Sequence, residues 1–143
     1  MERENEQEIR IPAAWQQRRT RGDGSEKKLM VYQVTIAFLL ENKEEALKKI
    51  RDNLELMKEN AEKILLVFSP HENCEQLERI DPALHEAFQE IVREYRDEDF
   101  GIYDEEHLSE ELPECFDAYY GDASVLAHHC RNAKVPVMLE AIV

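Results

Sequence analysis

The segment from residue 117 to residue 124 holds the residue types that could bind an anion. It reads Asp-Ala-Tyr-Tyr-Gly-Asp-Ala-Ser, and a helical pattern follows it. Glycine permits a tight turn from a strand into a helix. Free N–H groups in the first helical turn, together with the helix dipole, then favour negative charge, and a serine hydroxyl can add a donor. Gly121, Asp122 and Ser124 are therefore candidates for a phosphate-binding turn.

The same residues also have a simpler interpretation, in which they only cap the helix. Asp and Ser are both favoured at a helix N-cap. The negative charge of Asp122 also opposes anion binding, unless its carboxylate faces a hydroxyl group of the ligand. Spacing alone leaves both interpretations open.

His71 is the second candidate, because it follows directly after an apolar run in Ser69-Pro70-His71-Glu72. An imidazole beyond a strand end can contact a phosphate or act as an acid, although a loop histidine is more often only exposed. The sequence contains no P-loop, GxGxxG, HExxH or nucleophile-elbow motif. The residues alone therefore predict no catalytic group, no metal ligand and no cofactor.

The elements that must position these residues alternate between apolar strands and amphipathic helices. We expect strands at 29–36, 63–69, 100–104, 115–120 and 135–139, helices at 43–62, 82–95 and 122–132, and a short helix before the fourth strand. This order favours a parallel sheet with helices on both faces. The fold class is therefore α/β, a Rossmann-like single domain of about five strands. We place this domain at 29–143, after a polar leader or linker at 1–28.

The topology also predicts where a ligand would bind. In open parallel sheets, ligands bind beyond the carboxyl ends of the strands, at the point where the strand order reverses. If the order is 3-2-1-4-5, that point lies between the first and fourth strands. His71 and the turn at 121–124 both follow strand ends, so we expect them at this edge of the sheet.

Composition limits the classes of partner. The chain has 143 residues, with 32 acidic and 18 basic side chains and a formal net charge of −14, which opposes nucleic-acid binding. Cys74, Cys115 and Cys130 form no CxxC pair, so we expect reduced thiols. The N-terminus is charged and no apolar run approaches the roughly 20 residues that span a bilayer, so we predict a cytoplasmic protein without a transmembrane segment.

Several segments carry a resemblance to a known family. Phe100-Gly-Ile-Tyr-Asp104, Asp117-Ala-Tyr-Tyr-Gly-Asp-x-Ser124 and Lys134-Val-Pro-Val-Met-Leu139 resemble the nucleotide-binding half of CDP-glycerol glycerophosphotransferase-like proteins. These are bacterial wall- and capsule-polymer transferases with a two-domain glycosyltransferase type B fold. Ser69-Pro70-His71 resembles their Arg-Pro-His-Pro element, and the similarity covers roughly residues 11 to 140.

The resemblance implies a role for each candidate residue. His71 would contact the phosphates of a CDP-activated donor, and Gly121, Asp122 and Ser124 would form the second wall of that phosphate site. It also implies a cytoplasmic location, peripheral to the inner face of the membrane.

Three positions depart from the family pattern. Ser69 stands where an arginine is usual, Glu72 replaces the second proline, and Val125 often corresponds to a second serine. The half that would carry the acceptor site and the catalytic base is absent from the chain. We therefore expect a donor-binding half that is not catalytically complete without an N-terminal domain or a partner protein. The alternative is a non-catalytic interaction module that keeps the fold without the ligand.

Overall fold

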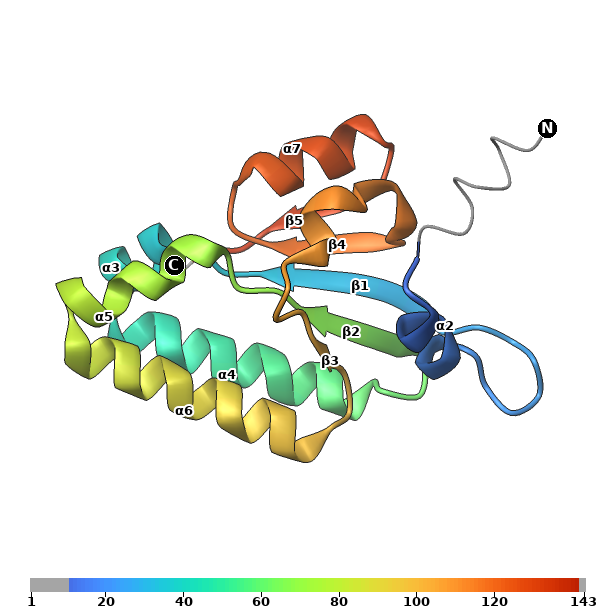
Figure 1. Cartoon of the computed structure of the whole chain (residues 1–143), viewed down its shortest axis with the longest axis horizontal. Coiled ribbons are helices and arrows are strands. Elements are labelled where there is room, and N and C mark those ends of the chain that lie inside the picture. The colour runs from blue at the N-terminus through green and yellow to red at the C-terminus, as the bar shows by residue number, and fades with distance from the viewer. Residues whose placement is uncertain (1–10, 142–143) are drawn as a thin grey trace.

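The computed structural model describes residues 11–141, so the predicted leader before Ile11 and the last two residues of the predicted domain lie outside the described residues. Five parallel strands form one sheet in the order β3-β2-β1-β4-β5 (Figure 1). The strands are β1 (Lys28–Gln33), β2 (Ile64–Phe68), β3 (Ile102–Tyr103), β4 (Ala118–Gly121) and β5 (Val137–Leu139). The predicted α/β class and strand order are both confirmed.

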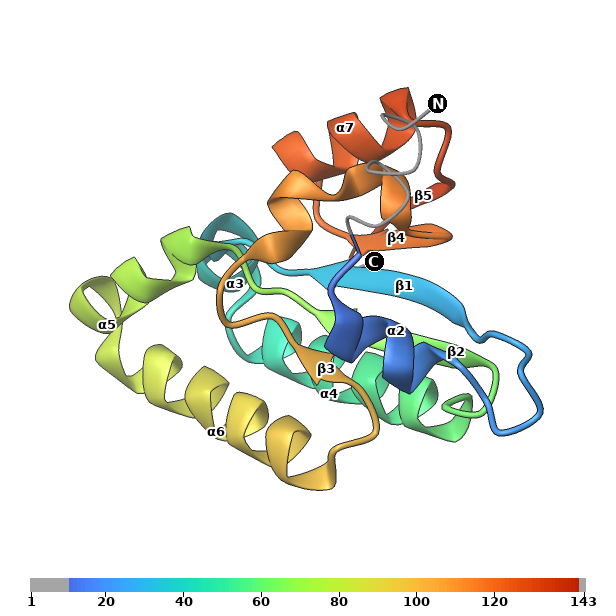
Figure 2. The same cartoon turned by 45° about the vertical axis from the view of Figure 1, so that its right-hand side comes forward.

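Helices cover both faces of this sheet. The α-helices are α2 (Ala13–Arg19), α3 (Ile36–Asn42), α4 (Glu44–Glu59), α5 (Leu77–Ile80), α6 (Pro82–Glu98) and α7 (Val125–Asn132). Short 3-10 helices are η1 (Glu72–Gln76), η2 (Leu108–Glu111) and η3 (Pro113–Cys115). Figures 1 and 2 show α4 and α6 packed together on one face and α7 on the other.

Alternating side chains of the central strands fill the two halves of the core. Leu29 and Val31 of β1 pack on the α7 face, whereas Met30 and Tyr32 pack on the face covered by α4 and α6. Successive side chains of a strand point to opposite faces. Both faces are buried here, which explains why the strand sequences are apolar runs rather than alternating patterns.

Helix α6 begins and packs as its sequence predicts. The Asp81 side chain accepts a hydrogen bond from the Leu84 N–H at 3.2 Å, and Pro82 occupies the first helical position. The apolar face is buried against the sheet and consists of Leu84, Phe88, Ile91, Val92 and Tyr95. The sequence signals for this helix were strong because cap, proline and apolar spacing agree.

The edges of other elements differ from the prediction. The first strand ends at Gln33 rather than at Ile36, because Ile36 begins α3 and its N–H donates to the Asn73 side chain at 3.1 Å. The fourth strand begins at Ala118, since Cys115 belongs to η3. The apolar character of these residues predicted strands, whereas the Asn73 side chain of η1 accepts a hydrogen bond at the start of α3.

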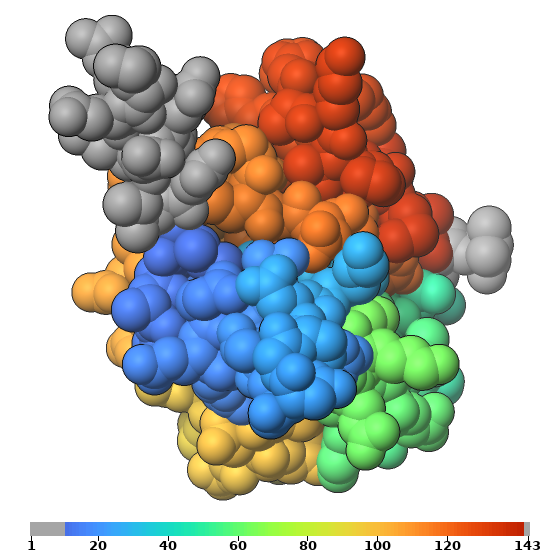
Figure 3. Space-filling model, turned by 90° about the vertical axis from the view of Figure 1, so that its right-hand side faces the viewer, coloured from blue at the N-terminus to red at the C-terminus, as the bar shows by residue number. Residues whose placement is uncertain are grey.

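The N-terminal segment covers the amino ends of the strands. The Trp15 side chain is 5% exposed, and its ring centre lies 6.1 Å from that of Phe116. Three guanidinium groups donate hydrogen bonds to the rest of the domain. The acceptors are the Asp99 carbonyl for Arg18, the Asp117 carboxylate for Arg19 and the Glu62 carbonyl for Arg21. Figure 3 views this end of the molecule and shows the segment (blue) spread across its centre. The carboxyl ends of the strands therefore lie on the opposite side.

Candidate functional site

Gly121 brings the end of β4 unusually close to β1. Its φ angle is 146°, and a Cβ atom at this position would collide with the Gln33 backbone. An L side chain is therefore excluded both by conformation and by space. Gly121 is a candidate from the sequence because glycine permits a tight turn. In the structure, glycine is required because β4 closely approaches the backbone of β1 at the predicted switch point.

Asp122 joins the ends of the same two strands. Its Oδ2 accepts hydrogen bonds from the Thr35 N–H at 2.5 Å and the Thr35 hydroxyl at 2.8 Å. The side chain is buried, and this burial raises the pKa of its carboxyl group. Its Oδ1 has no hydrogen-bond partner among residues 11–141. Asp122 thus closes the switch point between β1 and β4 and does not cap α7.

Ser124 is the residue that caps α7. Its Oγ accepts a hydrogen bond from the Ala127 N–H at 3.1 Å and lies 3.1 Å from the Tyr119 hydroxyl oxygen. Tyr119 in turn donates to the Asp122 carbonyl at 2.5 Å. Ser124 therefore caps α7, and the hydroxyl of Tyr119 fixes the turn from within.

Gln33 and Glu110 were missed by the sequence reasoning. Gln33 is fully buried, and its Nε2 donates to the Glu110 carboxylate at 2.7 Å. The Tyr119 hydroxyl lies 3.4 Å from Gln33 Oε1, so this network continues to the turn at Ser124. The only sequence signal was a single amide in an otherwise apolar strand. The network adds a carboxylate near the turn, which weakens the case for a bare anion site there.

His71 is held by two hydrogen bonds beyond the end of β2. Its backbone N–H donates to the Val34 carbonyl at 2.8 Å, and its ring Nδ1 accepts from the Asn73 N–H at 3.0 Å. Because Nδ1 serves as the acceptor, the neutral imidazole carries its proton on Nε2. His71 therefore presents a fixed N–H donor at the carboxyl edge of the sheet.

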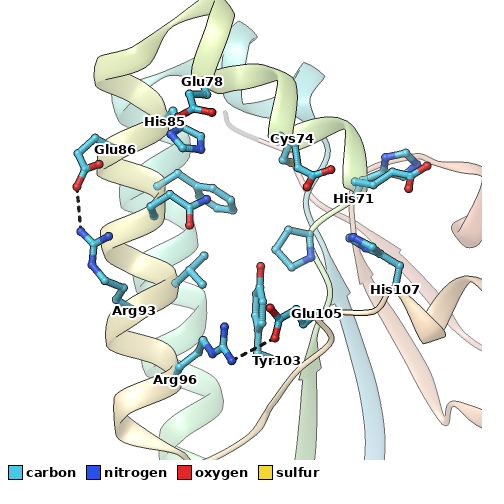
Figure 4. A pocket seen from close by; sticks show the side chains of 16 residues that line it. His71, Cys74, Glu78, His85, Glu86, Arg93, Arg96, Tyr103, Glu105 and His107 are labelled. Carbon is cyan, nitrogen blue, oxygen red and sulfur yellow. Dashed lines mark hydrogen bonds and ion pairs between the residues drawn. The ribbon is translucent and has the colours of Figure 1, made fainter.

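A cavity of about 540 Å³ lies beside His71, between α6 and the ends of β2 and β3 (Figure 4). It is lined by side chains that include His71, His85, His107, Arg93, Arg96 and Tyr103. Gly121, Asp122 and Ser124 do not line it. The structure thus brings His71 to a cavity one strand away from the switch point, and the two halves of the predicted site lie on neighbouring parts of the same edge.

Both arginines of this cavity already have carboxylate partners. Arg93 lies 3.0 Å from Glu86, and Arg96 lies 3.4 Å from Glu105. The Arg96 guanidinium carbon also stands 5.0 Å from the centre of the Tyr103 ring, within the range of a cation–π contact. Burial raises the pKa of Tyr103, although the Arg96 charge opposes this shift. The α6 wall is therefore close to neutral rather than strongly cationic.

The loop after β3 holds His107 at the opposite wall. His107 has a φ angle of 58°, which is uncommon outside glycine. Asp104 fixes the loop, because its buried carboxylate accepts from the Leu108 N–H at 2.9 Å, the Ser109 N–H at 2.8 Å and the Ser69 hydroxyl at 3.1 Å. Nothing in the sequence around His107 suggested this backbone conformation.

Glu140 is a further buried carboxylate at this edge, directly after β5. It accepts hydrogen bonds from the Tyr32 hydroxyl at 2.8 Å and from Asn53 Nδ2 at 3.1 Å. Burial, and secondarily the charge of Asp122, raises the pKa of Glu140 to about 7. The carboxyl edge therefore holds a proton-sensitive group that the sequence did not reveal.

These features define an α/β domain with a Rossmann-like sheet whose polar side chains gather at its carboxyl edge. No protein-family model, no curated protein and no solved structure matches the chain. Within residues 11–141, no helix has the length and apolar character needed to cross a membrane. The same residues contain no group of three or more His, Cys, Asp or Glu side chains that could hold a metal ion.

Proposed function

We propose that this chain is the donor-nucleotide-binding half of a CDP-glycerol:polymer glycerophosphotransferase-like protein of bacterial wall or capsule polysaccharide synthesis. The observation that carries the proposal is His71, a fixed Nε2–H donor at the carboxyl edge of the sheet that lines a cavity of about 540 Å³. Small-molecule sites in proteins have volumes of about 300–1,000 Å³. The family resemblance described above assigns the same residues to the donor phosphates.

In this proposal the donor lies along the carboxyl edge of the sheet. Its phosphates contact His71 and the first turn of α7, and the remainder of the nucleotide occupies the cavity beside α6. Asp122 acts by position, because its bonds to Thr35 hold the α7 turn against β1. Transfer to a polymer requires an acceptor site and a base, which in this proposal belong to a second domain or to a partner protein.

A non-catalytic interaction module is the second candidate, and two observations favour it. Ser69 stands where the family usually has an arginine, and its hydroxyl is buried against Asp104 rather than facing a ligand. Glu72 adds an exposed negative charge next to His71. Both features reduce the attraction for a diphosphate, so they point to retention of the fold without the ligand.

Titration of the whole chain with CDP-glycerol and with CDP, followed by NMR, separates the two candidates. We expect saturable shifts that are lost in His71→Ala and kept in His129→Ala, a control at an exposed histidine of α7 that does not line the cavity. An absence of shifts at millimolar nucleotide would overturn nucleotide binding and support the interaction module.

Ser124 needs two variants because it also caps α7. Ser124→Ala removes the cap and costs about 1 kcal/mol of stability. Ser124→Asp keeps a favoured cap residue but adds a negative charge. We expect Ser124→Asp to fold with near-native stability and to bind CDP more weakly, whereas a pure capping role predicts unchanged binding.

A further inference from the structure

We propose that His107 and His71 together form an oxyanion clamp, in which two imidazole N–H groups hold one phosphate group at the carboxyl edge of the sheet. The assignment of that phosphate to a nucleotide rests on the function proposed above. The clamp itself requires only a ligand with a phosphate or diphosphate group.

The two imidazoles reach the same part of the cavity from different strands. His71 follows β2, and His107 lies in the loop that follows β3. Both line the cavity, and Figure 4 shows them together at the side away from α6, opposite His85, Glu86, Arg93 and Arg96. Adjacent parallel strands thus deliver one imidazole each to a single wall.

The tautomer of the His71 ring determines which class of ligand the ring can bind. The Asn73 N–H occupies the Nδ1 lone pair, so Nε2 carries the proton in the neutral ring. A protonated Nε2 cannot ligate a metal ion, but it can donate to an oxygen atom. The His107 ring has no hydrogen-bond partner assigned within residues 11–141, so it too can turn a donor toward the same oxyanion.

The backbone at His107 is built to keep this residue in place. Its φ of 58° lies in the left-handed region, which is uncommon outside glycine but in which His, like Asn and Asp, is enriched. The buried Asp104 carboxylate fixes the loop that follows, because it accepts hydrogen bonds from the N–H groups of Leu108 and Ser109. The loop therefore holds the His107 backbone at the cavity wall.

The cavity wall carries more carboxylates than guanidinium groups, because Glu72, Glu75 and Glu78 line it in addition to two ion pairs. Arg93 and Arg96 face Glu86 and Glu105 at 3.0 and 3.4 Å, so their charges are partly neutralised. The charges of Glu72, Glu75 and Glu78 oppose a bound anion and limit the affinity of the clamp. We therefore infer a weak phosphate site.

Inorganic pyrophosphate is the probe for the clamp, with the histidine ring signals of the whole chain followed by NMR. We expect the His71 and His107 signals to shift together and saturate. His107→Asn removes the imidazole and keeps a residue that tolerates the left-handed backbone. Loss of one hydrogen bond to a charged group predicts roughly a tenfold weaker affinity in this variant. His129→Ala, at an exposed residue of α7 outside the cavity, should bind as the native chain does, and thermal midpoints confirm that each variant is folded.

The outcomes separate the clamp from the proposed function. No response to millimolar pyrophosphate, or equal affinity of His107→Asn and the native chain, overturns the clamp. If CDP binds tightly and His107→Asn has no effect, nucleotide binding stands and the clamp falls. If pyrophosphate shifts both rings and CDP binds no better than pyrophosphate, the clamp stands and the nucleotide assignment falls.

Discussion

Glu140 links the stability of this domain to pH through one buried carboxyl group. Its folded-state pKa of about 7 lies above the ordinary value of 4.5, because burial disfavours the charged form. A raised folded-state pKa means that the native state binds the proton more tightly than the unfolded state. The stability from this group is therefore complete below about pH 4.5 and is lost as the pH rises through about 7.

Glu140→Gln tests this linkage. The glutamine keeps hydrogen-bonding capacity toward Tyr32 and Asn53 but cannot titrate. We expect the difference in free energy of unfolding between variant and native chain to grow in favour of the variant by about 1–2 kcal/mol between about pH 5 and pH 8, after allowance for solvent screening. Urea unfolding at both pH values measures it, with exposed Glu90→Gln as the control. A difference that does not change with pH contradicts the assignment.

Glu72 sets the electrostatic cost of an anion beside His71. Glu72→Gln removes one negative charge from the cavity wall, and the side chain is exposed, so the fold should tolerate the change. We expect pyrophosphate to bind about two- to fivefold more tightly, with a smaller gain at high salt because exposed charges are screened. NMR titration at low and high ionic strength measures the effect. Equal affinity of the two chains would place the anion away from residue 72.

The turn between β4 and α7 depends on a backbone conformation that only glycine adopts readily. At Gly121 a φ of 146° coincides with contact against the Gln33 backbone. Gly121→Ala should therefore lower the free energy of unfolding by about 2–4 kcal/mol. Gly22→Ala is the matched control, since an added Cβ there meets nothing within 4 Å. Chemical denaturation compares the two, and a similar small effect in both would show that β4 can move away from β1.

Local sequence patterns predicted the elements well and their connections poorly. The apolar runs of β1 and β2 and the Asp81-Pro82 start of α6 are local signals, so they could be read directly. The bond from Asp122 to Thr35 joins residues 87 positions apart, and no local pattern contains it. The cavity at His71 likewise arises from α6 and the loop after β3 together, which is why sequence reasoning placed the site only at the switch point.

The stability of the whole domain depends on its N-terminal segment, because this segment covers the amino ends of the strands. Trp15 is 5% exposed and packs against Phe116 on the α7 face of the sheet. Trp15→Ala should lower the free energy of unfolding by about 3–5 kcal/mol. Exposed Gln17→Ala, in the same helix, is the control. If Trp15→Ala unfolds at the same urea concentration as that control, the segment is attached by its arginines alone.

The N-terminal segment and the proposed site lie at opposite ends of the strands, so the N-terminal end offers a place to attach the protein in a binding experiment. The loop that contains Gly22 and Gly24 projects from the amino end, where added Cβ atoms meet no neighbour within 4 Å. A single biotin or fluorophore attached there would face away from His71 and the turn at 121–124. Chains tethered to a sensor surface through this loop would all present the carboxyl edge to solution, so nucleotide, pyrophosphate and a candidate partner half could be compared in one orientation.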